Sequence, residues 1–134
     1  MKKRSFYKPN LQKWTEEQYA LFRNALSENA GIFFDLLRMG VRKNEALALT
    51  PSDISPIGIS INKAFSRDCP KKYRTVQLSA SFVKKLQMLC LGKAIDEAIF
   101  QDFNPNYILI KHQQELGLPP IHIYSIVGEH RETF

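Results

Sequence analysis

The sequence predicts an α+β fold: a mostly helical single domain with a small antiparallel β-hairpin or sheet. Apolar residues recur at helical spacing in several stretches, most clearly in residues 19–26 and 82–90. Isoleucines alternate with small or polar residues from Ile57 to Ile61, which is the period of a β-strand. The chain has 134 residues, 44% of them apolar, which suits one compact domain with its own core.

The first 13 residues form a basic arm ahead of the predicted domain. The arm contains four lysines and one arginine but no acidic residue. Such an arm either lies along a phosphate backbone or is a solvated, disordered tail, and the sequence leaves both interpretations open. We therefore divide the chain into the arm, residues 1–13, and the domain, residues 14–134.

The first helix of the domain begins at a capping box. Thr15 and Gln18 have the spacing at which each side chain bonds the backbone N–H of the other residue. The second predicted helix carries a core stripe within residues 33–37. This helix ends at Gly40, because a glycine in this position suits a left-handed cap.

The middle of the chain predicts a capped turn followed by two strands. Pro51 takes the first helical position of a short turn at residues 50–53. Residues 57–61 and 74–78 alternate as the two strands of a hairpin would. The connection between them, residues 62–73, is long for a hairpin and holds a single acid. Its cations are Lys63, Arg67, Lys71 and Lys72. The loop is either a solvated flap or a finger that contacts nucleic acid.

Three further helices complete the predicted fold. Ser79 or Ser81 caps a helix that ends near Gly92. Residues 104–116 form the next helix, with Asn-Pro at its start and a glycine directly after it. A last, short helix runs from residue 122 to about residue 130.

Charge and composition limit the partners that the chain suits. The formal charge is +6, from 19 Lys and Arg against 13 Asp and Glu, and this balance favours polyanionic partners. No apolar run approaches the roughly 20 residues that cross a bilayer, and the N-terminus has no segment of signal-peptide type. We therefore expect a cytoplasmic protein without membrane contact. Cys69 and Cys90 lack metal-binding spacing, so we predict no metal site, and no cofactor is expected.

Residues 39–54 carry the most informative motif. They read MGVRKNEALALTPSDI, which places Arg42 between the end of one helix and the start of the next. The segment resembles the first arginine motif of the tyrosine recombinases, the phage integrase family, whose pattern is roughly TGLRxSEhhxLxxxDh with h apolar. The resemblance implies the fold of that family's catalytic domain from Trp14 to about Gly128. It also implies that Arg42 binds a DNA phosphate.

Other positions of the family motif are matched incompletely. The resemblance places His122 at the histidine of the family's HxxR box, but Ser125 stands at the second arginine. The family uses a hairpin lysine as general acid, and Lys71 or Lys72 takes that place only with a shift in the loop. The family's nucleophilic tyrosine lies a few tens of residues beyond HxxR, and the chain ends before that place. We therefore expect a truncated and degenerate domain in which the matched residues are remnants of a catalytic site.

These departures predict that the chain has no recombinase activity of its own. A serine hydroxyl cannot replace the delocalised cation and paired donors of a guanidinium at Ser125. None of the five tyrosines occupies the nucleophile position, and we expect Tyr19 and Tyr107 on apolar helix faces. His130 matches the family's second histidine poorly and fits a surface histidine better.

Each matched residue also has a plainer interpretation. An arginine after a helix C-terminus can satisfy the last carbonyls and the helix dipole, and His122 can cap a helix start. We expect Glu45 and Asp53 to be structural, through capping or ion pairs. Charge on a protruding hairpin binds a phosphate backbone without exact geometry. The predicted DNA-binding residues are Arg42, Lys63, Arg67, Lys71, Lys72, Arg74 and His122.

The sequence thus leads us to expect an integrase-like protein that binds double-stranded DNA and serves as an accessory or regulatory factor of a mobile element. One alternative is a fragment or subunit of an active site-specific tyrosine recombinase, whose partner supplies the tyrosine and the arginine. The other alternative is a protein-interaction module on the same fold, as a homo-oligomer or bound to a recombinase. Duplex affinity that depends on salt distinguishes the first expectation from the last.

Overall fold

The chain combines helices with a small antiparallel sheet, so the predicted α+β class is confirmed. The computed structural model describes residues 13–62, 74–101 and 103–127. The chain divides into two compact units: unit 1 comprises Met1–Gly40 and Asn104–Phe134, and unit 2 comprises Val41–Phe103. Among the described residues, no helix has the length and apolar character needed to span a bilayer.

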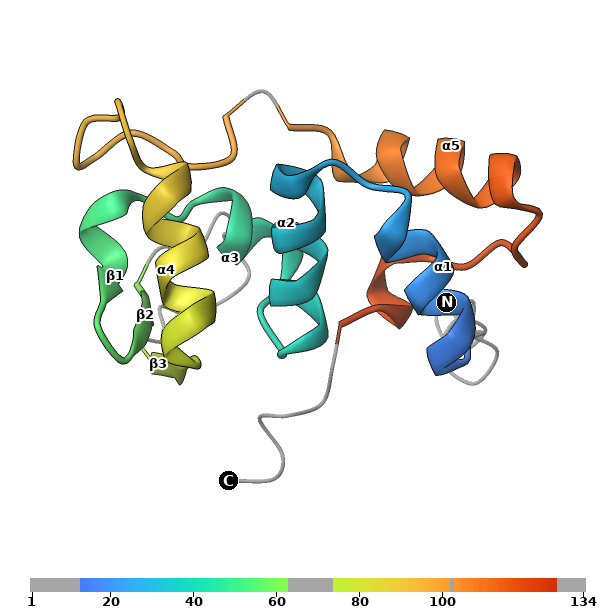
Figure 1. The fold of residues 1–134 in the computed structure, drawn as a ribbon, viewed down its shortest axis with the longest axis horizontal. Coiled ribbons are helices and arrows are strands. Elements are labelled where there is room, and N and C mark those ends of the chain that lie inside the picture. Colours follow the sequence, from blue (N-terminus) through green and yellow to red (C-terminus); the bar gives the residue numbers. More distant parts are fainter. Residues whose placement is uncertain (1–12, 63–73, 102, 128–134) are drawn as a thin grey trace, which may run out of the picture. The chain divides into compact units, whose positions relative to one another are not determined.

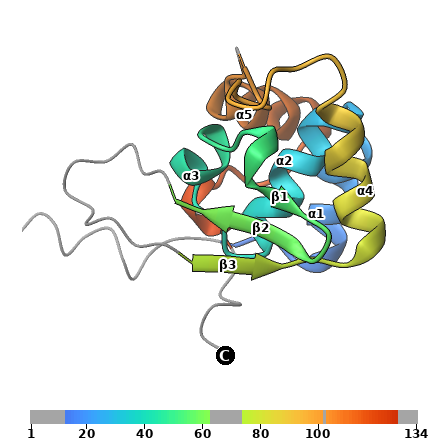
Figure 2. The same cartoon turned by 90° about the vertical axis from the view of Figure 1, so that its left-hand side faces the viewer.

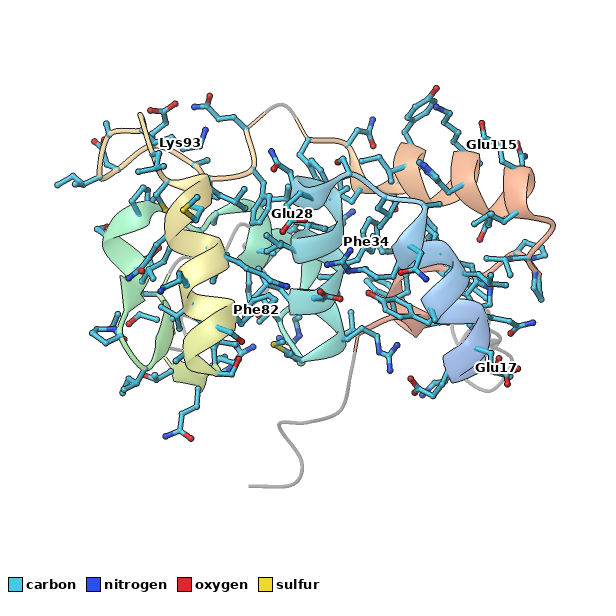
Figure 3. The ribbon with its side chains drawn as sticks, in the orientation of Figure 1. Glu17, Glu28, Phe34, Phe82, Lys93 and Glu115 are labelled. Carbon is cyan, nitrogen blue, oxygen red and sulfur yellow. The ribbon has the colours of Figure 1, made fainter. Side chains whose placement is uncertain are left out.

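Unit 1 is helical. Its elements are α1 (Glu16–Asn24), α2 (Glu28–Arg38), α5 (Pro105–Leu116) and the 3-10 turn η3 (Ile123–Ser125), and Figure 1 labels the three α-helices. The helix α1 packs against both α2 and α5. The buried Phe22 of α1 has its ring centroid 5.0 Å from that of Trp14 and 5.0 Å from that of Phe34 on α2. Phe34 is labelled in Figure 3, which also shows Glu17 and Glu115 as exposed side chains of α1 and α5.

The helix ends in unit 1 follow the local signals of the sequence. The backbone N–H of Gln18 donates to Thr15 Oγ1 at 3.1 Å, and the backbone N–H of Thr15 donates to Gln18 Oε1 at 2.9 Å. This is the predicted capping box. Asn104 caps α5 by accepting from the Tyr107 N–H at 3.1 Å, and Gly117 ends the helix with a φ of 70°. The predicted bounds of α5 are therefore confirmed.

Unit 2 contains the sheet. Its elements are α3 (Lys43–Leu47), the 3-10 turn η2 (Pro51–Asp53), β1 (Ile54–Ser55), β2 (Gly58–Ile61), β3 (Arg74–Gln77) and α4 (Ala80–Leu89). The strands are antiparallel in the order β1-β2-β3, and Figure 2 shows β2 in the middle. The helix α4 is capped by Ser79, one of the two predicted caps, and packs against β1. Its buried side chains are Phe82, Val83 and Leu86, and Phe82 is labelled in Figure 3.

The sheet corrects the predicted two-strand hairpin. A third strand, β1, precedes the two predicted strands and pairs Ser55 with Gly58. Ile57 was predicted as a strand residue, but it lies in the two-residue turn between β1 and β2, and its side chain is 61% exposed. The alternation of isoleucines runs on through this turn, so it could not mark where the strand begins.

The last predicted helix, residues 122–130, is wrong within the described residues. The backbone there forms the 3-10 turn η3, in which the N–H of Ser125 bonds the carbonyl of His122 at 2.8 Å. Ile126 and Val127 also bond the carbonyls three residues back, not four. Segments with such i→i+3 bonding are usually short, and residues 118–127 contain no α-helix.

Candidate nucleic-acid interface

Arg42 lies in the short segment that joins α2 to α3. The helix α2 ends at Arg38, and Gly40 follows with a φ of 99°, which residues with a β-carbon rarely adopt. Val41 is fully buried, whereas Arg42 is exposed and is the N-cap residue of α3. The left-handed turn predicted at Gly40 is confirmed, and it directs Arg42 into the start of α3.

Glu45 fixes the backbone at Arg42. Its Oε1 accepts a hydrogen bond from the Arg42 backbone N–H at 3.0 Å. An arginine side chain has no acceptor atom, so it cannot return the bond as a serine or threonine would in a full capping box. The same carboxylate accepts from Arg74 Nη1 at 2.8 Å and from Arg74 Nη2 at 2.9 Å. One buried carboxylate therefore ties the Arg42 turn to strand β3.

The electrostatics of Glu45 agree with this arrangement. Burial acts to raise the pKa of the Glu45 carboxyl, but the hydrogen bonds from Arg74 and from the Arg42 backbone outweigh it, helped by both positive charges. The net effect holds the pKa below its usual value of 4.5. The carboxylate is thus ionised in the folded protein at neutral pH, which a bidentate pair with arginine requires.

Asp53 has a similar structural task. Its Oδ2 accepts from the Thr50 backbone N–H at 3.0 Å and from the Thr50 hydroxyl at 3.1 Å. Its Oδ1 accepts from the side-chain amide of Asn62, at the end of β2, at 3.0 Å. The prediction that Glu45 and Asp53 are structural is confirmed by these bonds.

Arg74 was predicted to contact DNA, and the structure places its guanidinium against Glu45. Its side chain is 28% exposed and that of Glu45 is 10% exposed. Arg74 and Val76 are partly buried and lie on the same face of β3. Thr75 and Gln77 lie on the other face and are exposed. DNA contact by Arg74 stays a prediction, and the charge it offers is compensated by its partner.

The other cations of the hairpin connection are not placed. Lys63, Arg67, Lys71 and Lys72 lie outside the described residues. Their assignment as DNA contacts, and that of Lys71 or Lys72 as a general acid, therefore stay predictions. The same holds for His130 and for the basic arm, of which only Lys13 is described.

His122 is the N-cap of η3 in unit 1. Its Nδ1 accepts from the Tyr124 backbone N–H at 3.2 Å, and its ring lies 4.5 Å from the Tyr124 ring. The neutral histidine that accepts through Nδ1 carries its proton on Nε2, so the outer edge of the ring is a donor. His122 belongs to unit 1 and Arg42 to unit 2, and each is described within its own unit.

Two residues that sequence reasoning missed hold the segment before His122. Trp14 Nε1 donates to the Pro119 carbonyl at 2.8 Å, and the Ile121 N–H donates to Oε1 of the buried Gln113 at 3.3 Å. A polar residue on the inner face of α5 was the only signal for Gln113. Nothing local in the sequence links Trp14 to Pro119.

Ser125, which the sequence resemblance would place at the second arginine of the family, has its hydroxyl turned inward. Its Oγ is buried and has no hydrogen-bond partner among the described residues. A hydroxyl in that state cannot bind a phosphate in the described conformation. Ser125 therefore offers a phosphate neither a positive charge nor an exposed hydroxyl in the described conformation.

The tyrosines differ from one another in exposure. The Tyr19 hydroxyl donates to Asp35 at 3.3 Å, and burial, followed by the Asp35 charge, raises the pKa of Tyr19 well above 10. A phenol with such a raised pKa is a poor nucleophile at neutral pH. Tyr107 was expected on an apolar face of α5, but its side chain is 61% exposed, so that expectation is wrong. Tyr124 is also exposed.

No known family model matches the chain, and no curated protein sequence matches it. Within the described parts of the chain, no group of three or more His, Cys, Asp or Glu residues could hold a metal ion.

Proposed function

We propose that the chain is a DNA-binding protein resembling a tyrosine recombinase catalytic domain, without recombinase activity of its own, and that it acts as an accessory factor of a mobile element. The observation that carries this proposal is the Arg42 turn. Arg42 is exposed, its backbone is fixed by Glu45, and its guanidinium forms no hydrogen bond or ion pair with any described residue.

The position of Arg42 argues against a purely structural role. A helix N-terminus carries partial positive charge, so a cation there is electrostatically unfavourable. The simpler interpretation, in which Arg42 satisfies the carbonyls at the end of α2, has no hydrogen bond to support it within residues 13–62. The Glu45 carboxylate offsets part of the Arg42 charge, and an anion outside the chain, such as a DNA phosphate, would offset the rest.

The charge of unit 2 supports the same proposal. Residues 41–103 carry ten Lys and Arg against six Asp and Glu. Glu45 and Asp53 are two of those acids, and both are buried and hydrogen-bonded inside the unit. Arg74 offsets Glu45, so without this pair and the buried Asp53 the unit carries nine Lys and Arg against four Asp and Glu, which favours a polyanion such as duplex DNA.

Ser125 supports the absence of catalysis. Two guanidiniums clamp the phosphate of the family's transition state, and a buried hydroxyl supplies no charge to it. DNA binding needs no such clamp, because phosphate contacts are separate and additive in their effect on counterions. The two halves of the proposal therefore rest on different residues.

The test is the salt dependence of duplex affinity. Fluorescence anisotropy with a labelled duplex, between about 50 and 200 mM salt, should give a log affinity that falls linearly with log salt. Replacing Lys71 and Lys72 with glutamine should weaken binding to all sequences alike and flatten the slope by up to about 1.8. Replacing Lys84 and Lys85, which are exposed on α4, removes the same charge and is the matched control.

The control separates a located interface from general attraction. A slope that flattens for Lys71 and Lys72 and not for Lys84 and Lys85 supports binding at the hairpin. An equal change of slope in the two double variants would show that the hairpin has no special role in DNA binding. Absence of duplex affinity in the unmodified protein at low salt would refute the proposal.

A protein-interaction module is the second candidate, and one observation favours it. Met88, Leu91 and Ile95 are all more than 60% exposed near the C-terminal end of α4. Met88 and Leu91 lie on one turn, since the Leu91 N–H bonds the Met88 carbonyl. Self-association that persists in high salt and is lost in Leu91→Ser, with no duplex affinity, would favour this candidate.

A further inference from the structure

The link from Arg74 to Arg42 passes through one carboxylate. Glu45 uses Oε2 for Arg74 and shares Oε1 between Arg74 and the backbone N–H of Arg42. All three hydrogen bonds are 3.0 Å or shorter, and the Glu45 side chain is 10% exposed. Hydrogen bonds of this kind to an ionised group are among the stronger ones in proteins.

The ion pair spans two elements that are distant in sequence. Arg74 and Glu45 are 29 residues apart, and strand β3 is held to β2 by its ladder, with Arg74 opposite Ile61. Figure 2 shows β3 at the edge of the sheet. The guanidinium is thus anchored through its strand, and the Glu45 carboxylate is anchored by the guanidinium.

Glu45 takes up the two N–H donors at the fork of Arg74, so Arg74 cannot turn this fork to a phosphate and keep both bonds to Glu45. If Arg74 turned to DNA, it would leave a largely buried carboxylate without its cation, which is costly. Glu45 would then also hold the Arg42 backbone less firmly. The geometry therefore favours a role for Arg74 inside the protein.

We propose that Arg74 is a positioning residue, which orients Glu45 and through it fixes the Arg42 turn for phosphate binding. This inference rests on the proposed function, because Arg74 would support the phosphate contact that we propose for Arg42. A planar guanidinium is required, since only its fork reaches both carboxylate oxygens in parallel. A lysine at residue 74 keeps the charge and loses that geometry.

For Glu45→Gln, a positioning role of Arg74 and a purely electrostatic role of Glu45 predict opposite changes in DNA affinity. Glu45→Gln raises the net charge by one, so a purely electrostatic view predicts tighter DNA binding. Positioning predicts weaker binding, because glutamine cannot hold the Arg74 fork. Arg74→Lys leaves the charge unchanged and is expected to weaken binding as well. Asp96→Asn, at an exposed acid of unit 2, makes the same charge change as Glu45→Gln and is the control.

The experiment is a double-mutant cycle on duplex affinity. Arg42→Ala should weaken binding by about tenfold, the scale of one hydrogen-bonded contact to a charged group. Glu45→Gln and Arg74→Lys should each weaken it by about three- to tenfold, and neither should weaken it further when Arg42 is already alanine. Asp96→Asn should leave binding unchanged or tighten it. Binding in Glu45→Gln as tight as in Asp96→Asn, or additive losses with Arg42→Ala, would overturn the inference.

A second measurement keeps the inference separate from the proposed function. Hydrogen exchange of the Arg42 backbone amide reports the Glu45 bond directly and needs no DNA. It should speed up in Glu45→Gln and in Arg74→Lys, while amides of α5 in unit 1 exchange as before. Unchanged exchange at Arg42 in both variants would refute the positioning role even if the protein binds DNA. Faster exchange without any duplex affinity would leave the positioning intact and refute the function.

Discussion

Replacing Gly40 with alanine tests the turn that presents Arg42. Gly40 has a φ of 99°, beyond the left-handed region near 50–70° that other residues visit. A β-carbon there meets backbone strain, so we expect the variant to be less stable. Gly117→Ala is the matched control, because Gly117 also has a positive φ, 70°, and a β-carbon built on it contacts nothing within 4 Å.

The size of the effect follows from the two φ angles. A side chain in the left-handed region costs about 1–2 kcal/mol, and Gly40 lies at the upper end of that range because its φ is further from the allowed region. Alanine also restricts the unfolded chain, which offsets about 0.4–1 kcal/mol. We expect a net loss of about 1 kcal/mol at Gly40 and about half as much at Gly117. For a chain of this size each kcal/mol lowers Tm by about 3–5 °C.

The assay pairs thermal unfolding with duplex binding. Circular dichroism melts should place Gly40→Ala below Gly117→Ala, and both below the unmodified protein. Gly40→Ala should also weaken duplex binding, because Arg42 lies two residues further on, whereas Gly117→Ala should leave binding unchanged. A Gly40→Ala protein that melts with the unmodified one would refute the strain argument. Unchanged binding in a destabilised Gly40→Ala would show that the turn does not orient Arg42.

Three further predictions follow from single groups. Ser125→Ala removes a buried hydroxyl without a described partner, so urea unfolding should show no loss of stability or a gain of up to about 1 kcal/mol. A measurable loss of stability would show that the hydroxyl has a hydrogen-bond partner. The folded pKa of Glu45 lies below its usual value, so the stability that Glu45 contributes is present above pH 4.5 and is lost as the pH falls through the folded pKa. Glu45→Gln should therefore make the stability depend less on pH in the acid range. An unchanged dependence in that range would contradict this. Incubation with nicked suicide duplexes should yield no adduct that survives boiling in detergent, and a covalent band abolished by Tyr124→Phe would restore the enzyme hypothesis.

The elements that the sequence predicted well have local causes. The helix α5 was predicted to its ends because Asn104, Pro105 and Gly117 each act within a few residues. The capping box at Thr15 and the turn at Gly40 are equally local. Such signals are legible before any tertiary contact is known.

The predictions from sequence were wrong or incomplete where the structure of a residue depends on partners that are distant in the chain. The strand β1 is two residues long and exists through its pairing with β2, so it has no pattern of its own. Arg74 was grouped with surface cations, although its shared parity with Val76 already indicated the inner face of β3. Its partner, Glu45, is 29 residues earlier and could be identified only from the fold.

The discontinuity of unit 1 has a consequence for how the chain acquires its structure. Unit 2 is one continuous stretch, whereas unit 1 needs α5 to cover α1, and the Trp14 to Pro119 bond joins residues 105 positions apart. As the chain leaves the ribosome, residues 41–103 are complete while Phe22 of α1 still lacks its contact with His112 of α5. Closing so long a loop is slow relative to the local pairing of β2 and β3. We therefore expect the sheet unit to acquire protection first during refolding, and the face of α1 that α5 covers to stay accessible to chaperones until α5 has emerged from the ribosome.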